Sequence, residues 1–197
     1  MVEVEVGVPI GDEDLRPLRL GDALFISGRV FTARDRAHRR ILEHLERGVK
    51  LPFDPSGGVI YHCGPVVVRS GGSWKVVSAG PTTSARMEQY LGRLTASLKL
   101  KVVLGKGGLS QSAIRELAGN GAIYCAITGG AGALWASKVK GVVNVHWLDL
   151  GTPEAVWELE VERLGPAFVA SDLCGRSLYD EVRRRATGRA RPPDYEL

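Results

Sequence analysis

The alternation of apolar and polar positions along the chain predicts an α/β protein. Short β-branched runs bounded by glycine, proline or aspartate are typical of strands, and they span residues 2–6, 22–28, 58–63, 74–80, 100–105, 122–127, 142–147, 156–162 and 167–171. Apolar residues recur at helical spacing over residues 33–48, 84–98, 110–118, 133–139 and 177–185. Because strands and helices alternate through the middle and strands dominate the ends, we expect a partly parallel, mixed sheet flanked by helices.

Two of these helices have clear apolar faces. We expect the first to begin with a capping box formed by Thr32 and Asp35 and to end at Gly48. Its apolar face would comprise Ala37, Ile41, Leu42 and Leu45, and that of the helix over 84–98 would comprise Met87, Tyr90, Leu91, Leu94 and Leu98.

Composition places the chain among soluble globular proteins of one domain. It has 197 residues, 44% hydrophobic and 24% charged. No apolar run is long enough to span a membrane, and the start, "MVEVEVGVPI", is not a secretory leader. We therefore expect a cytoplasmic location and no membrane partner, with one domain over residues 1–182 and a basic, proline-containing tail over residues 183–197.

The net charge of +4 comes mostly from this tail. Its fifteen residues hold five arginines and two acidic residues, which leaves the rest of the chain with a net charge of +1. A nearly neutral body does not favour a nucleic-acid partner. Asparagine and glutamine are scarce, with two of each, as in thermophilic proteins.

The three cysteines, Cys63, Cys125 and Cys174, are widely spaced and form no C-x-x-C pair. This pattern fits neither a disulfide framework nor a zinc site, and we expect buried reduced thiols. The chain is therefore not expected to hold a metal, and an iron-sulfur cluster would need residues from another chain.

The stretch "AGPTTSARM" predicts an anion site. A strand ends at Gly80, and Thr82 or Thr83 would cap the following helix, so that free N–H groups face a crevice. Arg86 follows one turn later. One threonine suffices as a cap, so the second favours a ligand, although the plain alternative is a cap beside a surface arginine.

A second glycine-rich turn, "VVLGKGGLS", carries Lys106. Its neighbours add no side chains, so the lysine can approach an anion closely. A phosphate-binding P-loop would need glycine where Leu100 stands and serine or threonine where Gly107 stands, and a dinucleotide fingerprint would need glycine at Ser110. Nucleotide binding is therefore disfavoured, and a plain turn with an exposed lysine stays the alternative.

Arg34 lies in the first turn of a predicted helix, where an acidic residue would be favoured, and this hints at an anionic ligand. A third strand, turn and helix occurs in "AITGGAGALWAS". Such ends gather at the carboxyl edge of an α/β sheet, so Arg34, Arg86, Lys106 and the two threonines could form a receptor for a small dianion. The four histidines have no metal-ligand spacing and are expected to be structural.

The stretches "GRVFTARDRAHRR", "GGVIYHCGPVV", "VVSAGPTTSARMEQYL", "KVVLGKGGL", "CAITGGAGAL" and "AFVASDLCGRSLYDEV" resemble, in this order, the beta subunit or C-terminal domain of class I iron-sulfur hydro-lyases, the fumarase and tartrate dehydratase group. The resemblance covers about residues 21–182. It implies a swivelling β/β/α domain that closes over a 4Fe-4S cluster carried by an alpha subunit, in a hetero-oligomer.

The resemblance also implies a mechanism and roles. The open iron acts as a Lewis acid on the leaving hydroxyl, while a base removes the C3 proton from the other face. Thr82 resembles the family's base, and Arg34, Arg86 and Lys106 resemble the residues that bind the substrate carboxylates. Arg36 stands where the family often has a small residue.

These observations favour the beta subunit of a fumarate hydratase, a hydro-lyase that is active only with its alpha subunit and interconverts (S)-malate and fumarate in the tricarboxylic acid cycle. The same residues would serve an L(+)-tartrate dehydratase. A third hypothesis is a non-catalytic subunit that senses a dicarboxylate or assists assembly.

Overall fold

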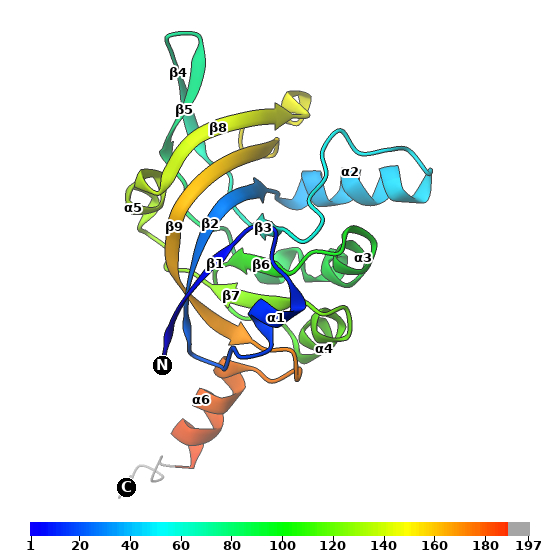
Figure 1. Cartoon of the computed structure of the whole chain (residues 1–197). Helices are drawn as coiled ribbons and strands as arrows, with labels where there is room; N and C mark the ends of the chain where they lie inside the picture. Colours follow the sequence, from blue (N-terminus) through cyan, green and yellow to red (C-terminus); the bar gives the residue numbers. More distant parts are fainter. Residues whose placement is uncertain (189–197) are drawn as a thin grey trace, which may run out of the picture.

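The computed structural model describes residues 1–188, and strands alternate with helices through the middle of the chain (Figure 1). The strands are β1 (Glu3–Gly7), β2 (Ala23–Thr32), β3 (Val59–Tyr61), β4 (Val66–Ser70), β5 (Ser73–Ser78), β6 (Val102–Gly105), β7 (Ile123–Ala126), β8 (Val139–His146) and β9 (Val156–Ser171). The helices are α1 (Asp12–Leu15), α2 (Asp35–Glu46), α3 (Glu88–Leu98), α4 (Gln111–Gly119), α5 (Gly132–Ser137) and α6 (Leu178–Thr187), with 3₁₀ turns at Ser84–Arg86 and Leu148–Leu150. The expected mixed sheet flanked by helices is confirmed.

The main sheet has seven strands in the order β1-β2-β3-β6-β7-β9-β8. Strands β2, β3, β6 and β7 are mutually parallel neighbours, whereas β9 runs antiparallel to β7 and β8. Strand β9 also pairs with β2, so β2, β3, β6, β7 and β9 form a closed ring. Closure leaves these five strands without an unpaired edge on the ring.

Side chains in the central strands alternate between two apolar clusters. In β3, Val59 and Tyr61 belong to the cluster inside the ring, whereas Ile60 packs against the helices. In β6, Leu104 faces the interior and Val103 faces the helices. Because both faces are covered, these strands read as continuous apolar runs.

Helices α2, α3 and α4 lie together on the outer face of the ring (Figure 1). Ile41 of α2 and Leu94 of α3 belong to one cluster, and Leu117 of α4 belongs to the next. The predicted apolar faces of the first two helices are confirmed, with Leu45 and Tyr90 only partly buried.

The predicted capping box is wrong. The N-cap of α2 is Arg34, and no side chain caps it. Thr32 instead lies fully buried at the end of β2, where its hydroxyl accepts a hydrogen bond from the backbone N–H of Trp157 over 3.0 Å. The hydroxyl therefore joins β2 to β9 and does not start the helix.

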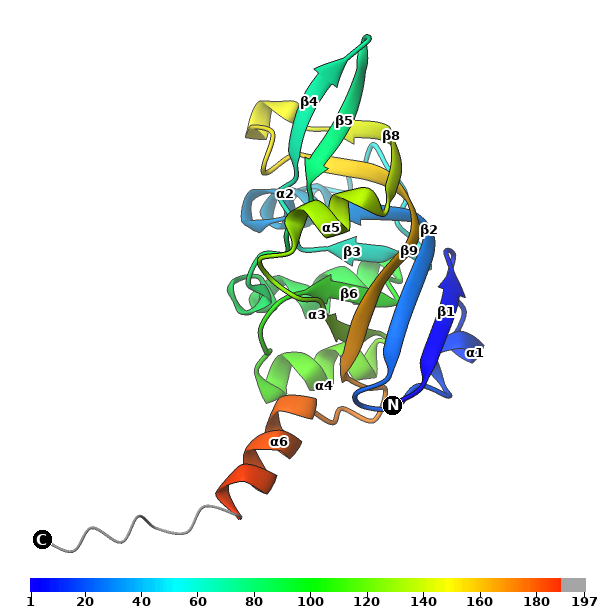
Figure 2. The same ribbon diagram turned by 90° about the vertical axis from the view of Figure 1, so that its left-hand side faces the viewer.

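Three other elements differ from expectation. The last two predicted strands are one strand of 16 residues, β9, which bends around the ring. Helix α1 and strand β4 were not expected. Strand β4 pairs with β5 in a hairpin that projects from one end of the molecule (Figure 2). Trp74 of β5 packs edge-on against Trp157 with ring centroids 5.3 Å apart.

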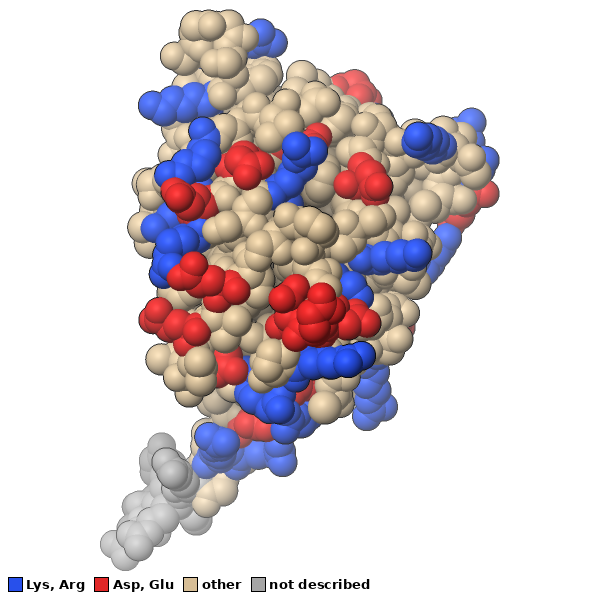
Figure 3. All heavy atoms as spheres, in the orientation of Figure 1, with Lys and Arg blue, Asp and Glu red and all other residues tan. Residues whose placement is uncertain are grey.

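At the opposite end, α6 leads away from the body and buries none of its residues (Figure 2). The predicted basic tail over 183–197 begins inside this helix, and its residues 189–197 lie outside the described residues. On the face in Figure 3, acidic and basic side chains are interspersed over the body, and basic ones gather at the end that carries α6. Between residues 1 and 188, no helix is long and apolar enough to cross a membrane.

Candidate functional site

The candidate site lies at the carboxyl edge of the parallel strands. Arg34 follows β2, His62 and Gly64 follow β3, and Lys106 follows β6. Because β2, β3 and β6 are adjacent and parallel, these segments leave the sheet side by side. Ligands of α/β proteins bind at the carboxyl edge of the parallel strands in both open sheets and closed barrels, and the segments predicted to bind an anion gather there.

Backbone hydrogen bonds bring Thr82 and Lys106 together. The Thr82 N–H donates to the carbonyl of His62 over 2.7 Å, and the Thr82 carbonyl accepts from the Lys106 N–H over 3.2 Å. The Ser84 N–H then donates to the Lys106 carbonyl over 3.0 Å, and Thr83 and Lys106 form a parallel bridge. The two predicted segments therefore extend the sheet as one continuous surface.

The expected threonine cap is absent. The turn Ser84–Arg86 is a short 3₁₀ helix, Thr83 at its N-cap makes no side-chain capping bond, and α3 begins only at Glu88. Thr82 is half-buried and lies two residues before the turn. A helix dipole is therefore a smaller part of this site than the sequence indicated.

Arg34 lies against Gly64 and pairs with an acidic side chain. Its Nε is 3.5 Å from a carboxylate oxygen of Glu154, and its side chain is only 25% exposed. A Cβ added at Gly64 would lie 2.7 Å from Arg34 Nη1, so glycine leaves the space that the guanidinium occupies. Glu154 also gives a partner within the chain to the cation at the start of α2, whose position in the sequence was a hint of an anionic ligand.

Glu154 also binds Arg36. Its second carboxylate oxygen accepts from the Arg36 backbone N–H over 2.9 Å, while the Arg36 guanidinium donates to the Leu150 carbonyl over 2.8 Å. The charge of Arg36 is thus held by the loop before β9.

Arg86 reaches across to the start of α2. Its Nη2 donates to a carboxylate oxygen of Asp35 over 2.8 Å, and half of its side chain is exposed. A guanidinium has five N–H donors, so this contact fixes the side chain and leaves donors free for a ligand. Asp35 directly follows Arg34, which links the segments that carry the two arginines.

Lys106 is half-buried and forms no ion pair with a residue of the described chain. Its Cδ would lie 3.2 Å from a Cβ added at Gly129, in the third predicted glycine-rich turn. All three predicted turns therefore meet around this lysine, and its charge is available to an anion.

The neighbouring helix end argues against a nucleotide. The Ser110 side chain caps α4 by accepting from the Ala113 N–H, and the Ser110 N–H donates to a Glu88 carboxylate oxygen over 2.9 Å. A carboxylate therefore stands where a phosphate would need free N–H groups.

Two buried histidines lie beneath these segments, and the sequence predicted only a structural role for them. His38 and His62 are fully buried, with ring centroids 5.0 Å apart. Burial lowers the pKa of His38 to about 4 and, with the nearby His38 and Arg86, holds the pKa of His62 well below its usual value. Both rings are therefore neutral near pH 7. In the sequence, the position of His62 directly after a buried strand was the signal that could have placed it near the site.

The cysteines do not fit a cluster. Cys63 and Cys125 are fully buried, and burial raises the pKa of both thiols, that of Cys63 to about 12. A cluster requires thiolates. Within residues 1–188, no group of three or more His, Cys, Asp or Glu side chains could hold a metal ion.

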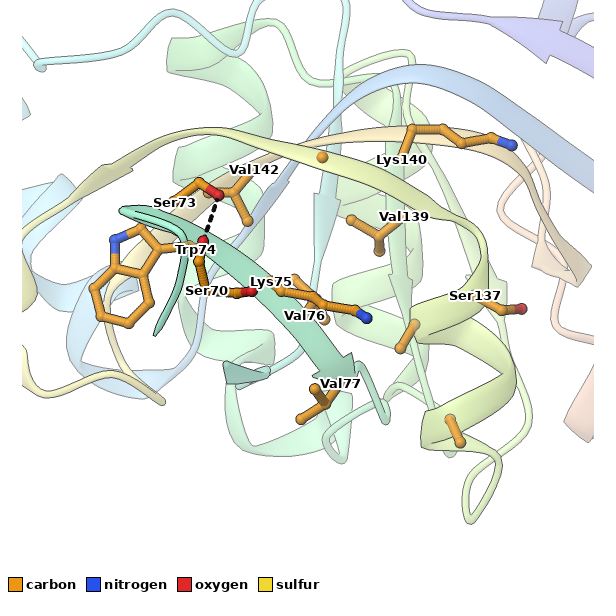
Figure 4. A pocket seen from close by; sticks show the side chains of 13 residues that line it. Ser70, Ser73, Trp74, Lys75, Val76, Val77, Ser137, Val139, Lys140 and Val142 are labelled. Atoms are coloured by element: carbon orange, nitrogen blue, oxygen red, sulfur yellow. Dashed lines mark hydrogen bonds between the residues drawn. The ribbon is translucent and has the colours of Figure 1, made fainter. Parts of the chain in front are cut away.

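A large surface groove lies elsewhere. It has a volume of about 660 Å³ and runs between β5, α5 and β8 (Figure 4). Apolar side chains including Trp74, Val76 and Val142 line it, with Lys75 and Lys140 beside them. None of the four predicted site residues lines this groove, so an apolar cavity does not mark the candidate site.

Comparison with known proteins identifies the family. Residues 1–182 match the family described as Fumarase C-terminus. A Methanocaldococcus jannaschii protein, named provisionally as an L(+)-tartrate dehydratase subunit beta, is 44% identical over 88% of this chain and 89% of its own length. The L(+)-tartrate dehydratase subunit beta of Escherichia coli is 36% identical over 96% of this chain and 92% of its own length.

A longer relative carries the same segment. A Geobacillus stearothermophilus protein, named provisionally as a class I fumarate hydratase, is 36% identical over 92% of this chain, but the match covers only 34% of its own length. The resemblance stated from the sequence is thus confirmed, while the roles given to Thr82, Arg34, Arg86 and Lys106 stay predictions. The chain belongs to the fumarase C-terminus family of hydro-lyases.

Proposed function

We propose that this chain is the beta subunit of a heteromeric fumarate hydratase that interconverts (S)-malate and fumarate. The observation that carries the proposal is the junction of Thr82 with Lys106 at the carboxyl edge of the parallel strands. Arg34 and Arg86 belong to two neighbouring segments, and the ion pair of Arg86 with Asp35, the residue after Arg34, connects these segments. A hydroxyl and three cations in one place are suited to a substrate with two carboxylates.

The cations differ in what they can bind. Arg86 has one donor on Asp35 and can present others in the planar fork that matches a carboxylate. Lys106 has no ion-pair partner among the described residues and would act as a point charge. Arg34, mostly buried and paired with Glu154, would orient the substrate with least movement of its own.

Thr82 would take the C3 proton of malate. A threonine hydroxyl is a weak base unless nearby groups favour its ionised form. Lys106 is one backbone hydrogen bond away along the extended sheet, and Arg86 follows four residues later. We propose that these cations stabilise the ionised form of Thr82 Oγ1, which takes the C3 proton to become the hydroxyl and gives that proton to solvent before the next turnover.

The rest of the site would come from an alpha subunit. The described cysteines do not fit a 4Fe-4S cluster, so we assign that cluster to the partner, where it would supply a Lewis acid for the leaving hydroxyl. The fumarate hydratase relative is about three times as long as the matched segment, which supports a requirement for further chain.

L(+)-tartrate is the second candidate substrate. It is favoured by the names of the two relatives that match along nearly their whole length. Tartrate has the same two carboxylates and one more hydroxyl than malate, so the cations described above would serve either molecule.

The two candidates are separated by a parallel assay. The chain is co-expressed with its alpha subunit, the cluster is reconstituted without oxygen, and turnover of (S)-malate and L(+)-tartrate is followed in matched samples. Malate turnover with a higher kcat/KM supports the fumarate hydratase. A higher value for tartrate replaces it with the tartrate dehydratase, and turnover of neither contradicts both.

A further inference from the structure

A buried histidine and serine join the two segments that carry the candidate site. His62 Nδ1 and Ser84 Oγ share a hydrogen bond of 2.9 Å, and both residues are fully buried. His62 follows β3, and Ser84 comes two residues after Thr82. The bond between His62 and Ser84 is thus a side-chain hydrogen bond between segments that are otherwise joined by backbone hydrogen bonds.

The backbone of His62 is hydrogen-bonded both to β6 and to the Thr82 segment. Its N–H donates to the Leu104 carbonyl over 2.7 Å, and its carbonyl accepts from the Thr82 N–H over 2.7 Å. The Ser84 N–H donates to the Lys106 carbonyl over 3.0 Å. The bond between His62 and Ser84 therefore closes a loop of contacts that includes both Thr82 and Lys106.

Gly105 leaves the space for this bond. A Cβ at Gly105 would overlap Ser84 Oγ and lie 3.2 Å from His62 Cβ. Gly105 is not among the glycines with positive φ, so its backbone conformation does not require glycine. The close approach of the His62 and Ser84 side chains is the reason that a larger residue is excluded.

The pair carries a cost in stability. His62 Nε2 is buried and has no hydrogen-bond partner in the described chain, and an unsatisfied buried polar group typically costs about 1–3 kcal/mol. Filling space alone would be better served by an apolar side chain. His62 is also fully buried and does not reach the surface where substrate would bind.

We propose that the hydrogen bond between His62 and Ser84 is a positioning element that sets the Thr82 segment against Lys106. His62 and Ser84 act through these two residues and do not touch the substrate. The kinetic part of this inference rests on the proposed function, whereas the structural part rests on backbone contacts alone.

Ser84→Ala tests the bond with the loss of one oxygen atom. In the complete chain, amide hydrogen exchange of Ser84 and Lys106 should accelerate at least about tenfold. The amide of Val169 in β9, which donates to the Asp22 carbonyl and takes no part in this loop of contacts, should keep its rate. In the reconstituted complex, kcat should fall about 10- to 100-fold, with a smaller change in KM, because a small misplacement of catalytic groups slows turnover.

Two substitutions of His62 separate positioning from space filling. In His62→Asn the amide lies near the former Nδ1 and can still bond Ser84, whereas in His62→Gln it lies near the former Nε2. Positioning predicts that His62→Asn retains the slower exchange of the Lys106 amide and the higher kcat. A role in filling space predicts the reverse, because glutamine is the larger residue.

The outcomes are distinct. Unchanged exchange at Ser84 and Lys106 in Ser84→Ala, or better retention by His62→Gln than by His62→Asn, would overturn the inference. If the wild-type complex turns over neither malate nor tartrate while exchange changes as described, the proposed function fails and the positioning inference is supported. Urea unfolding of each variant shows whether it folds, and Ser84→Ala is the mildest change should a His62 variant not fold.

Discussion

Acidification should destabilise the protein because two of its histidines are buried in the neutral form. An unfolded histidine titrates near 6.5, and burial lowers the pKa of folded His38 to about 4. Between these values the unfolded state binds a proton that the folded state does not, so stability is complete above about pH 6.5 and is lost as the pH falls.

The size of the effect follows from the shift. A pKa difference of one unit corresponds to about 1.4 kcal/mol, so His38 alone should remove about 2 kcal/mol of unfolding free energy between pH 7 and pH 5. His62 is shifted in the same direction and should add to the loss. Asp35 opposes the shift of His38, whereas His38 and Arg86 reinforce that of His62.

Urea unfolding at pH 7 and pH 5 measures this loss. The double variant His38→Gln/His62→Asn removes both titrating groups, so its stability should change much less over this range although its stability at pH 7 is lower. The same loss in the wild type and the double variant would refute the assignment to these histidines. Equal m-values at the two pH values would show that the unfolding transitions are comparable.

Further predictions concern the arginines and the fold. Arg86→Lys keeps the charge but loses the fork, so kcat/KM of the reconstituted complex should fall about 10- to 100-fold; wild-type turnover would remove Arg86 from the site. Gly64→Ala would crowd the Arg34 guanidinium and should raise KM for the dicarboxylate, and an unchanged KM would contradict the binding role. Thr32→Val leaves the Trp157 N–H unpaired in the core and should cost about 1–3 kcal/mol in urea unfolding, whereas Thr32→Ser, which keeps the hydroxyl, should cost less.

Local patterns in the sequence predicted the elements and the edge at which they meet. The run over 102–105 is apolar throughout because β6 is covered on both faces. Such a run predicts a buried strand, and the glycine-rich turn after it predicts that Lys106 stands at the strand end. The gathering of Arg34 and Lys106 then follows from parallel strand order. Thr82 follows β5 of the separate hairpin and reaches Lys106 through backbone hydrogen bonds that the sequence does not show.

Features that depend on distant contacts were missed. Closure of the ring requires β9 to pair with both β2 and β7, and its two halves appear as separate strands because Gly165 and Pro166 interrupt the apolar pattern. Thr32 looked like a helix cap, but its hydroxyl is used by Trp157, 125 residues away in sequence. No local pattern contains such partners.

In the candidate site, too, local patterns predicted some features, whereas distant contacts determine others. Residue type and spacing indicated which cations could bind an anion, but Asp35 and Glu154, which hold two of them, come from the start of α2 and a loop more than a hundred residues later. The pairing of His62 with Ser84 depends on the close approach of β3 to the turn after β5. A histidine at the end of a strand does not identify its partner.

The measurement that tests the central claim most directly is malate turnover by the reconstituted complex with Thr82→Ala and, as a matched control, Thr83→Ala. Both variants lose one half-exposed hydroxyl in the same segment. Loss of a catalytic base predicts a fall in kcat of about 10²- to 10⁴-fold for Thr82→Ala and a much smaller change for Thr83→Ala. Equal effects of the two substitutions, or full turnover in Thr82→Ala, would contradict the role of Thr82 in this site.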